Sequence, residues 1–193
     1  MSSAARIRIL DAANALFLQG GAGAVTMRAV ADRVGVTATA LYRHFENKDA
    51  LLNAVLTVGF QSFGGYLYRA LRGATPGERL KLAGQGYLDF ALEQPQLYRT
   101  IFMTPRPETS GCPPNEPQWH ATLQFLVDRV RECMEAGLLL PGEPFEVAVT
   151  IWSHVHGLVS LQLVGGTGLD EAAFRAAYAA SLERLFFGLL AHR

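Results

Sequence analysis

The chain has 193 residues, half of them hydrophobic and 18% charged, a composition that suits one compact globular domain or two small ones. Its 17 basic and 17 acidic residues cancel, so bulk charge does not indicate a nucleic-acid partner, and any such binding must come from the placement of residues. Because it has two cysteines, no signal-peptide core and no apolar run near the ~20 residues that span a bilayer, the sequence predicts a cytoplasmic protein.

The first predicted helix covers residues 3–19 and carries an apolar stripe on one face. The stripe recurs at helical spacing and consists of Ile9, Ala12, Ala13, Leu16 and Phe17. Gly20 and Gly21 follow directly, and glycine is the residue that most often ends a helix. Arg6 and Arg8, near the start of this helix, are available to DNA or to solvent.

Residues 26–48 carry the most informative pattern in the chain. They predict two short helices joined by a tight turn. Thr26 stands where an N-cap belongs, and the apolar residues after it recur at helical spacing: Met27, Val30, Ala31 and Val34. Gly35 marks the turn, and Thr37 caps a second helix over residues 37–44. Two helices separated by a short turn containing glycine are typical of a helix-turn-helix, whose second helix lies in the major groove of DNA.

The composition of the second helix distinguishes a DNA reader from a hairpin that serves only for packing. Its leading end is small, so the backbone can approach a groove closely, and its far end supplies hydrogen-bond donors that reach phosphates. Leu41 and Phe45, four residues apart, are expected to anchor the helix to the core. The sequence therefore predicts that DNA is contacted by Thr26, Arg28, Thr37, Ala38, Thr39, Tyr42, Arg43, His44 and Lys48.

About the first fifty residues closely resemble the DNA-binding domain of TetR/AcrR family transcriptional regulators. The matching residues are Ile9, Ala12, Ala13, Leu16, Phe17, Gly21, Val25, Thr26, Val30, Ala31, Gly35, Val36, Thr37, Leu41, Tyr42, His44, Phe45, Lys48, Leu51 and Leu52. The run LYRHFENKDALL, residues 41–52, is the most diagnostic part. The resemblance implies a DNA-binding domain over residues 1–50 and a ligand-binding and dimerisation domain over residues 51–193. It implies a ligand-responsive regulator, most often a repressor, that binds an operator as a homodimer.

The rest of the chain predicts helices only, so the expected fold class is all-α with about nine helices. A long helix over residues 48–71 is capped by Asn47 and would connect the two domains. Further helices are predicted over residues 77–93, 95–103, 118–136, 144–164 and 170–191. Residues 104–118 hold five of the nine prolines and are predicted to be an irregular loop or a lid.

Aromatic residues on several of these helices predict a pocket for a small, largely apolar ligand. The candidate ligand-binding residues are Tyr66, Phe90, Tyr98, Phe102, Phe125, Trp152 and His156, with Tyr87 and Met103 on the same helices. The alternative for each aromatic is that it belongs to the plain core. Trp152 and His156, one turn apart on one face, are the preferred pair. With Gly157 they resemble the Trp-His-Gly signature of one TetR-family C-terminal domain, although three residues separate the Trp from the His.

The last two predicted helices are strongly apolar, and the final one is rich in alanine. Alanines permit close helix approach, so the pair predicts a homodimer built as a two-fold four-helix bundle.

No metal, cofactor or catalytic role is predicted. His154 and His156 point about 200° apart on a helix and do not suit one metal ion. Ser153 and His156 share a face, but no nucleophile-elbow motif surrounds the serine, and no phosphate loop or dinucleotide fingerprint is present. Cys112 is either an exposed redox-sensing thiol or an incidental loop cysteine. The alternative function is a small-molecule-binding helical protein that does not bind an operator.

Overall fold

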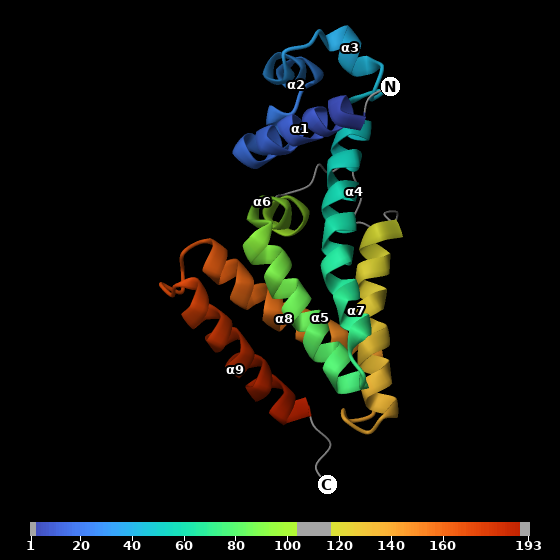
Figure 1. The fold of residues 1–193 in the computed structure, drawn as a ribbon, viewed down its shortest axis with the longest axis vertical. Helices are drawn as coiled ribbons and strands as arrows, with labels where there is room; N and C mark the ends of the chain where they lie inside the picture. The colour runs from blue at the N-terminus through green and yellow to red at the C-terminus, as the bar shows by residue number, and fades with distance from the viewer. Residues whose placement is uncertain (1–2, 104–116, 190–193) are drawn as a thin grey trace. The chain divides into compact units, whose positions relative to one another are not determined.

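The computed structural model describes residues 3–103 and 117–189, and within these ranges every regular element is helical and no strand occurs. The predicted all-α class is therefore confirmed, with nine α-helices in the described ranges (Figure 1). The α-helices are α1 (Ser3–Ala24), α2 (Met27–Val34), α3 (Ala38–Tyr42), α4 (Lys48–Leu67), α5 (Pro76–Glu93), α6 (Pro95–Tyr98), α7 (Pro117–Glu135), α8 (Pro144–Leu163) and α9 (Glu171–Leu189). A 3-10 helix, η1 (Tyr68–Arg72), extends α4, and a π-helix, η2 (Arg99–Met103), extends α6.

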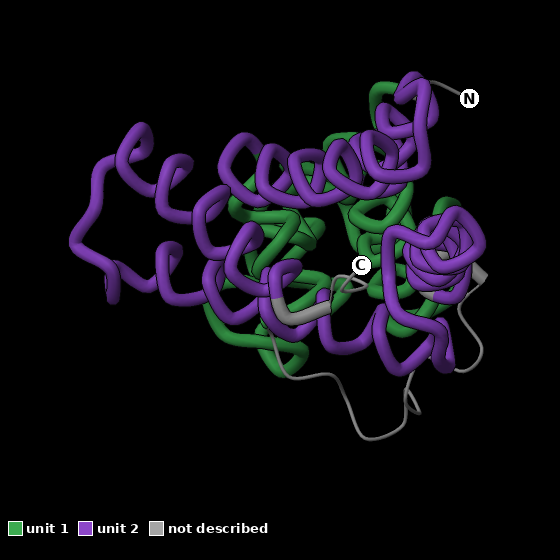
Figure 2. The backbone as a smooth tube through the Cα atoms, turned by 90° about the horizontal axis from the view of Figure 1, so that it is seen from below, with its two compact units in different colours: residues 1–62, 94–118 green, residues 63–93, 119–193 purple. Residues whose placement is uncertain are grey.

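The described residues form two compact units (Figure 2). Unit 1 combines residues 1–62 with residues 94–118, and unit 2 combines residues 63–93 with residues 119–193. The long helix α4 contributes to both, since Ser62 ends its part in unit 1 and Phe63 begins its part in unit 2. The short helix α6 belongs to the same unit as the predicted helix-turn-helix, although it follows α5 in the chain.

The core of unit 1 is made by α1 to α4. It consists of Ile9, Leu10, Ala12, Ala13, Phe17, Val25, Met27, Val30, Leu41, Phe45, Leu51, Leu52 and Val55. Burial of one large apolar side chain is worth about 1.5–3 kcal/mol, so this cluster is the main support of α2 and α3, which are short helices. Leu41 and Phe45 are buried as predicted, and of the predicted stripe on α1 only Leu16 is partly exposed.

The end of α1 differs from the prediction. The helical backbone does break at the predicted glycine pair, where Gly20 has φ −149° and Gly21 has φ 65°. A further helical turn then follows to Ala24. A Cβ on Gly20 would lie 2.8 Å from the Cβ of Ala24, so this close approach requires glycine at position 20.

The second helix of the predicted helix-turn-helix is shorter than expected. It ends at Tyr42 rather than at residue 44. Arg43 and His44 lie in a turn in which the His44 N–H donates to the Leu41 carbonyl at 2.9 Å and the Phe45 N–H donates to the same oxygen at 3.1 Å. Phe45 follows this turn and is buried in the core of unit 1.

Unit 2 is built from the end of α4 and from α5, α7, α8 and α9. Its core cluster contains Leu80, Val127, Val130, Cys133, Leu139, Ala148 and Ile151. The start of α5 is fixed by a reciprocal cap, since the Glu78 N–H donates to Thr75 Oγ1 and the Thr75 N–H donates to Glu78 Oε2, both at 3.2 Å. Farther along, Gly86 permits a close backbone contact, because a Cβ there would lie 2.5 Å from the Tyr66 carbonyl oxygen.

By length and composition alone, residues 48–72 could cross a membrane. Half of the 18-residue apolar stretch within this range is buried in the protein. A buried core helix of a soluble protein passes the same test, so this is weak support for a membrane span. Residues 104–116 of the predicted loop and lid, which include Cys112, lie outside the described residues. Residues 117 and 118, the end of the predicted loop, belong to α7 and are helical.

Candidate DNA-binding and ligand-binding sites

Three polar side chains fix the starts of α2, α3 and α4, the helices of the predicted DNA-binding site. Thr26 Oγ1 accepts a hydrogen bond from the Ala29 N–H at 3.0 Å, and Thr37 Oγ1 accepts one from the Ala40 N–H at 3.2 Å. Asn47 Oδ1 accepts one from the Ala50 N–H at 2.8 Å. Each bond satisfies an N–H group that a helix start otherwise leaves without a partner. The three predicted caps are confirmed.

The turn between α2 and α3 depends on Gly35. This residue has φ 80°, a left-handed backbone conformation that favours glycine. Its N–H donates to the Ala31 carbonyl at 2.9 Å, and the Val36 N–H donates to the same oxygen at 3.0 Å. These bonds end α2 and redirect the chain within two residues. The predicted helix-turn-helix, with its turn at Gly35, is confirmed.

The predicted DNA-contacting side chains lie at the surface of unit 1. Those that are exposed are Thr26, Arg28, Thr37, Thr39, Tyr42 and Arg43, and those that are half-buried are Ala38, His44 and Lys48. Tyr42 is 55% exposed, which shows that this large aromatic residue does not serve the core. Its neighbour Leu41 is fully buried. Helix α3 thus presents one face to the core and another to solvent.

Threonine caps can also donate outward. A hydroxyl has one donor and two acceptor positions, so Thr26 and Thr37 retain an O–H donor after accepting from their own helices. The start of a helix also carries partial positive charge. The exposed hydroxyl of Thr26, followed by exposed Arg28, is therefore a suitable donor set for an anionic oxygen such as a phosphate.

Two arginines of α1 have intramolecular partners that the sequence did not reveal. Arg8 donates from Nη2 to the carbonyl oxygen of Val34 at 2.9 Å. The guanidinium of Arg6 lies over the ring of Phe45, with its carbon 4.6 Å from the ring centroid. Both contacts join positions far apart in the chain, and no local pattern in the sequence indicates them.

The predicted ligand-binding residues are divided between the two units. In unit 1, fully buried Tyr98 packs against Phe102 with ring centroids 5.0 Å apart, and Phe102 contacts Phe60 edge-to-face at 6.0 Å. In unit 2, Phe125 packs against Tyr68 at 5.4 Å. These residues make ordinary aromatic contacts of a helical core.

The other four candidates join one aromatic network in unit 2. Tyr66 packs against Phe90 at 5.6 Å, and Phe63 contacts both Phe90 at 5.1 Å and Tyr87 at 5.5 Å. The Tyr87 hydroxyl lies 3.1 Å from His156 Nδ1, and His156 lies one turn from Trp152, with ring centroids 6.0 Å apart. Phe63 and Tyr87 are thus the residues that connect the set. Tyr87 was predicted to lie near the pocket, whereas Phe63 was predicted only as an apolar residue of the long helix that begins at residue 48.

The histidines of α8 bind different helices. His154 Nε2 lies 2.9 Å from Ser181 Oγ on α9, whereas His156 Nδ1 faces Tyr87 on α5. Burial lowers the pKa of His156 below its ordinary value of 6.5, which favours the neutral imidazole. Both ring nitrogens of His156 face hydroxyl groups of the protein, since Nε2 lies 3.4 Å from Ser160 Oγ.

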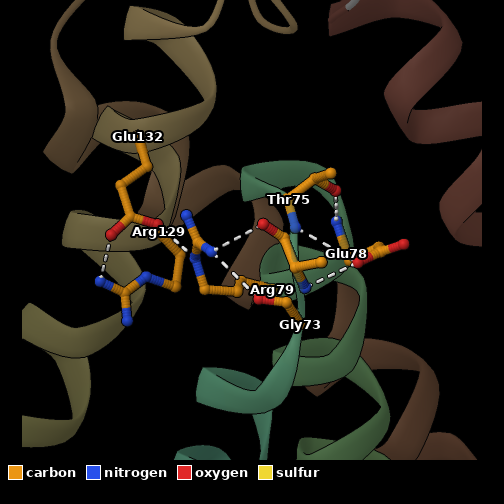
Figure 3. Close-up of polar contacts among 7 residues, drawn as sticks. Gly73, Thr75, Glu78, Arg79, Arg129 and Glu132 are labelled. Atoms are coloured by element: carbon orange, nitrogen blue, oxygen red, sulfur yellow. Dashed lines mark hydrogen bonds and ion pairs between the residues drawn. The ribbon is translucent and has the colours of Figure 1, made fainter.

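An ion-pair cluster joins the corner between η1 and α5 to α7 (Figure 3). Glu132 accepts from Arg79 Nε at 3.0 Å and from Arg129 Nη2 at 2.6 Å. Arg79 also donates from Nη1 to the Gly73 carbonyl at 3.0 Å. Although burial raises the pKa of Glu132, its hydrogen bonds from both arginines hold that pKa below the ordinary value. The cluster is a structural tie within unit 2, and the sequence analysis missed it.

Two family models match the chain. Residues 9–55 match the family model "Bacterial regulatory proteins, tetR family", and residues 80–185 match "Tetracyclin repressor-like, C-terminal domain". The chain is 37% identical over 98 residues to the HTH-type transcriptional activator FasR of Mycolicibacterium smegmatis, which is 50% of this chain and 45% of FasR. It is 47% identical over 76 residues to the HTH-type transcriptional repressor KstR of Mycobacterium tuberculosis, which is 39% of this chain and 34% of KstR.

The matched stretches thus span less than half the length of these two relatives. Among solved structures, the fold is similar to that of a TetR family transcription regulator from Marinobacter aquaeolei VT8, with a TM-score of 0.74 and 20% identity over 97% of this chain and 96% of that one.

Proposed function

The chain belongs to the TetR family of bacterial regulatory proteins, and on that premise we propose that it is a ligand-responsive, DNA-binding transcriptional regulator. In this proposal it binds a pseudo-palindromic operator as a homodimer in the cytoplasm and is released by a small, largely apolar effector. The carrying observation is the helix-turn-helix of unit 1, in which three caps and Gly35 fix the helix starts and the turn. Within it, α3 buries Leu41 in the core and exposes Tyr42.

Side chains at the start of α3 read the bases in this proposal, and those around them hold phosphates. Thr37, Ala38, Thr39 and Tyr42 face the major groove, where threonine methyls can contact thymine methyls. Phosphate contacts come from Thr26, Arg28, Tyr42, Arg43, His44 and Lys48. The half-buried Lys48 is the first residue of α4, where its charge and the helix N-terminus act on the same anion.

A homodimer through α8 and α9 is supported by the apolar groups that these helices expose. Leu161 is 54% exposed, Val164 is 66% exposed and Phe187 is 72% exposed. On α9, Ala172, Ala173, Ala176 and Ala177 are also exposed. A second copy of the same helix pair would remove this surface from water and complete a four-helix bundle.

The proposed effector site uses the aromatic network that ends at Trp152 and His156. The network consists mainly of apolar rings within unit 2. It contains few polar groups, and two of them are the Tyr87 hydroxyl and the His156 imidazole. An effector that binds one conformation of the dimer more tightly shifts the population away from the DNA-binding form, and α4, which contributes to both units, is the proposed connection.

Repression is the proposed direction of regulation. The relatives named above include an activator, FasR, and a repressor, KstR, and the stretch shared with KstR has the higher identity. The alternative, a small-molecule-binding protein without operator binding, is favoured only by the zero net charge of the chain.

Two substitutions test the proposed roles in DNA binding. Lys48→Ala is expected to weaken binding to all duplexes about equally and to reduce the salt slope by about 1.8, because the dimer loses two phosphate contacts, one from each protomer. Thr39→Ala is expected to change the preference among sequences while the salt slope stays the same. The measurement is duplex affinity by gel shift at several salt concentrations, starting with the DNA upstream of the coding region. If neither change affects binding, α3 is not the reading helix.

A further inference from the structure

The last turn of α2 has a carbonyl group that its own helix end does not satisfy. The N–H groups of Gly35 and Val36 both donate to the Ala31 carbonyl, at 2.9 and 3.0 Å. The carbonyl of Val34, the residue before the turn, instead accepts from Arg8 Nη2 at 2.9 Å. A side chain of α1 thus completes the end of α2 directly before the helix-turn-helix turn.

This contact is favourable for two physical reasons. The C-terminal end of a helix carries partial negative charge, so the guanidinium of Arg8 is favoured at that place. Its acceptor is a backbone oxygen, so the bond fixes the path of the chain into Gly35 rather than a side-chain rotamer. Arg8 is exposed and takes no part in the core of unit 1.

Arg6 makes a second contact from α1, with Phe45, which follows α3 in the chain. Its guanidinium carbon lies 4.6 Å from the centroid of the Phe45 ring, an attractive cation–π arrangement. Phe45 is buried, and its N–H donates to the Leu41 carbonyl of α3 at 3.1 Å. The two arginines of α1 therefore contact Val34, the last residue of α2, and Phe45, the third residue after α3.

We propose that Arg8, together with Arg6, is a positioning residue that holds α3 at the angle required to discriminate between DNA sequences. This inference rests on the proposed function, since it concerns how the helix-turn-helix is presented to DNA. The contribution of Arg8 is then geometric. Removal of Arg8 should therefore reduce the discrimination between DNA sequences. Loss of a phosphate contact would instead weaken binding to all sequences about equally and lower the salt slope.

The test compares Arg8→Met and Arg8→Lys with a matched charge control. Arg72→Met is that control, because Arg72 is an exposed arginine of η1 in unit 2. Affinities are measured for an operator selected from a random DNA pool and for a scrambled duplex, over a range of salt. Arg8→Met is expected to weaken binding to the operator on the order of tenfold. Its affinity for the scrambled duplex and its salt slope are expected to equal those of Arg72→Met. Arg8→Lys should restore most of the operator affinity, because an ammonium group can donate to the same carbonyl.

Arg6→Met is a second variant, expected to reduce discrimination in the same way, so a folding defect in one variant still leaves a test. Circular dichroism confirms that each variant is folded at the assay temperature. An equal loss on both duplexes with a shallower salt slope identifies a phosphate contact and overturns the proposal. Unchanged discrimination in the folded variants overturns it as well. A wild-type protein that binds no duplex contradicts the proposed function itself, whereas wild-type binding with unaltered Arg8→Met discrimination contradicts only this inference.

Discussion

At the scale of single residues, the polar side chains on the surface of unit 1 are of two kinds. Some form hydrogen bonds that support the fold, and others retain a donor for DNA. The hydroxyls of Thr26 and Thr37 accept hydrogen bonds from their own helices and still carry a donor. Arg8, by contrast, already donates to a backbone carbonyl. Residue type alone does not distinguish these cases, because arginine and threonine are both common in DNA contacts.

His156 gives a prediction about pH. Burial lowers its pKa in the folded protein, so the unfolded chain takes up a proton near pH 6.5 more readily than the folded chain does. The contribution of His156 to stability is therefore fully present above pH 6.5 and declines as the pH falls below that value. His156→Gln, which does not titrate, is expected to make the unfolding free energy less dependent on pH between 7 and 5, as measured by urea denaturation.

Tyr87→Phe is the matched control for this measurement. It removes the hydroxyl beside His156 but keeps the buried imidazole, so stability should fall by about 0.5–1.5 kcal/mol while the pH dependence remains. An identical pH dependence in the wild type and in His156→Gln would contradict the assignment of the effect to His156.

At the scale of elements, the turn between α2 and α3 depends on a backbone conformation that only glycine adopts easily. Gly35→Ala is expected to lower the unfolding free energy by about 1–2 kcal/mol, because φ 80° places a Cβ against the following carbonyl. No other atom lies within 4 Å of that Cβ, so the effect comes from the backbone and not from a clash. Thermal and urea unfolding measure the change.

Gly65→Ala is the matched control, because a Cβ at this position in α4 also meets nothing within 4 Å and the backbone is helical. There the change should stabilise the protein by about 0.5–1 kcal/mol, since alanine is the better helix residue. Equal effects of the two substitutions would show that the left-handed backbone at Gly35 carries no cost.

Most of the elements followed from local patterns in the sequence, and their differences from the structure have physical causes. Caps, glycine positions and apolar spacing are local, so Thr26, Gly35, Thr37 and Asn47 were identified correctly. The end of α3 at Tyr42 differs from the predicted end at residue 44, although Phe45 is buried as its spacing from Leu41 indicates. The capping pair of Thr75 and Glu78 is a local signal that the analysis overlooked.

The site was predictable only in part, because contacts between distant segments have no local signature. The exposure of Tyr42 beside buried Leu41 follows from spacing along a helix. The bond from Arg8 to Val34 spans 26 residues, and the contact of Tyr87 with His156 spans 69. Such pairs depend on how the helices pack. From the sequence alone, other arginines and tyrosines are equally good candidates for the same contacts.

At the scale of the whole molecule, the exposed alanines of α9 give a prediction about assembly. Ala176→Arg places a charged side chain on the surface proposed to meet a second copy, where burial without a partner is costly. The protein is expected to become monomeric at concentrations where the wild type is a dimer, with dimer affinity reduced at least about tenfold. Sedimentation equilibrium measures the change.

Ala121→Arg is the control for assembly, since Ala121 is an exposed alanine of α7. It should leave the dimer unchanged. A wild type that sediments as a monomer would contradict the proposed dimer. A dimer that tolerates Ala176→Arg would show that the interface lies elsewhere.

The central claim is that this chain recognises specific DNA through α3 as a dimer. Selection of bound sequences from a random DNA pool tests it most directly, since no operator has to be assumed. The account predicts convergence on a pseudo-palindrome whose half-site centres are about 10–10.5 base pairs, or a multiple of that spacing, apart. It also predicts a different consensus for Thr39→Ala. Enriched sequences that share no consensus, or no enrichment at all, would contradict the claim.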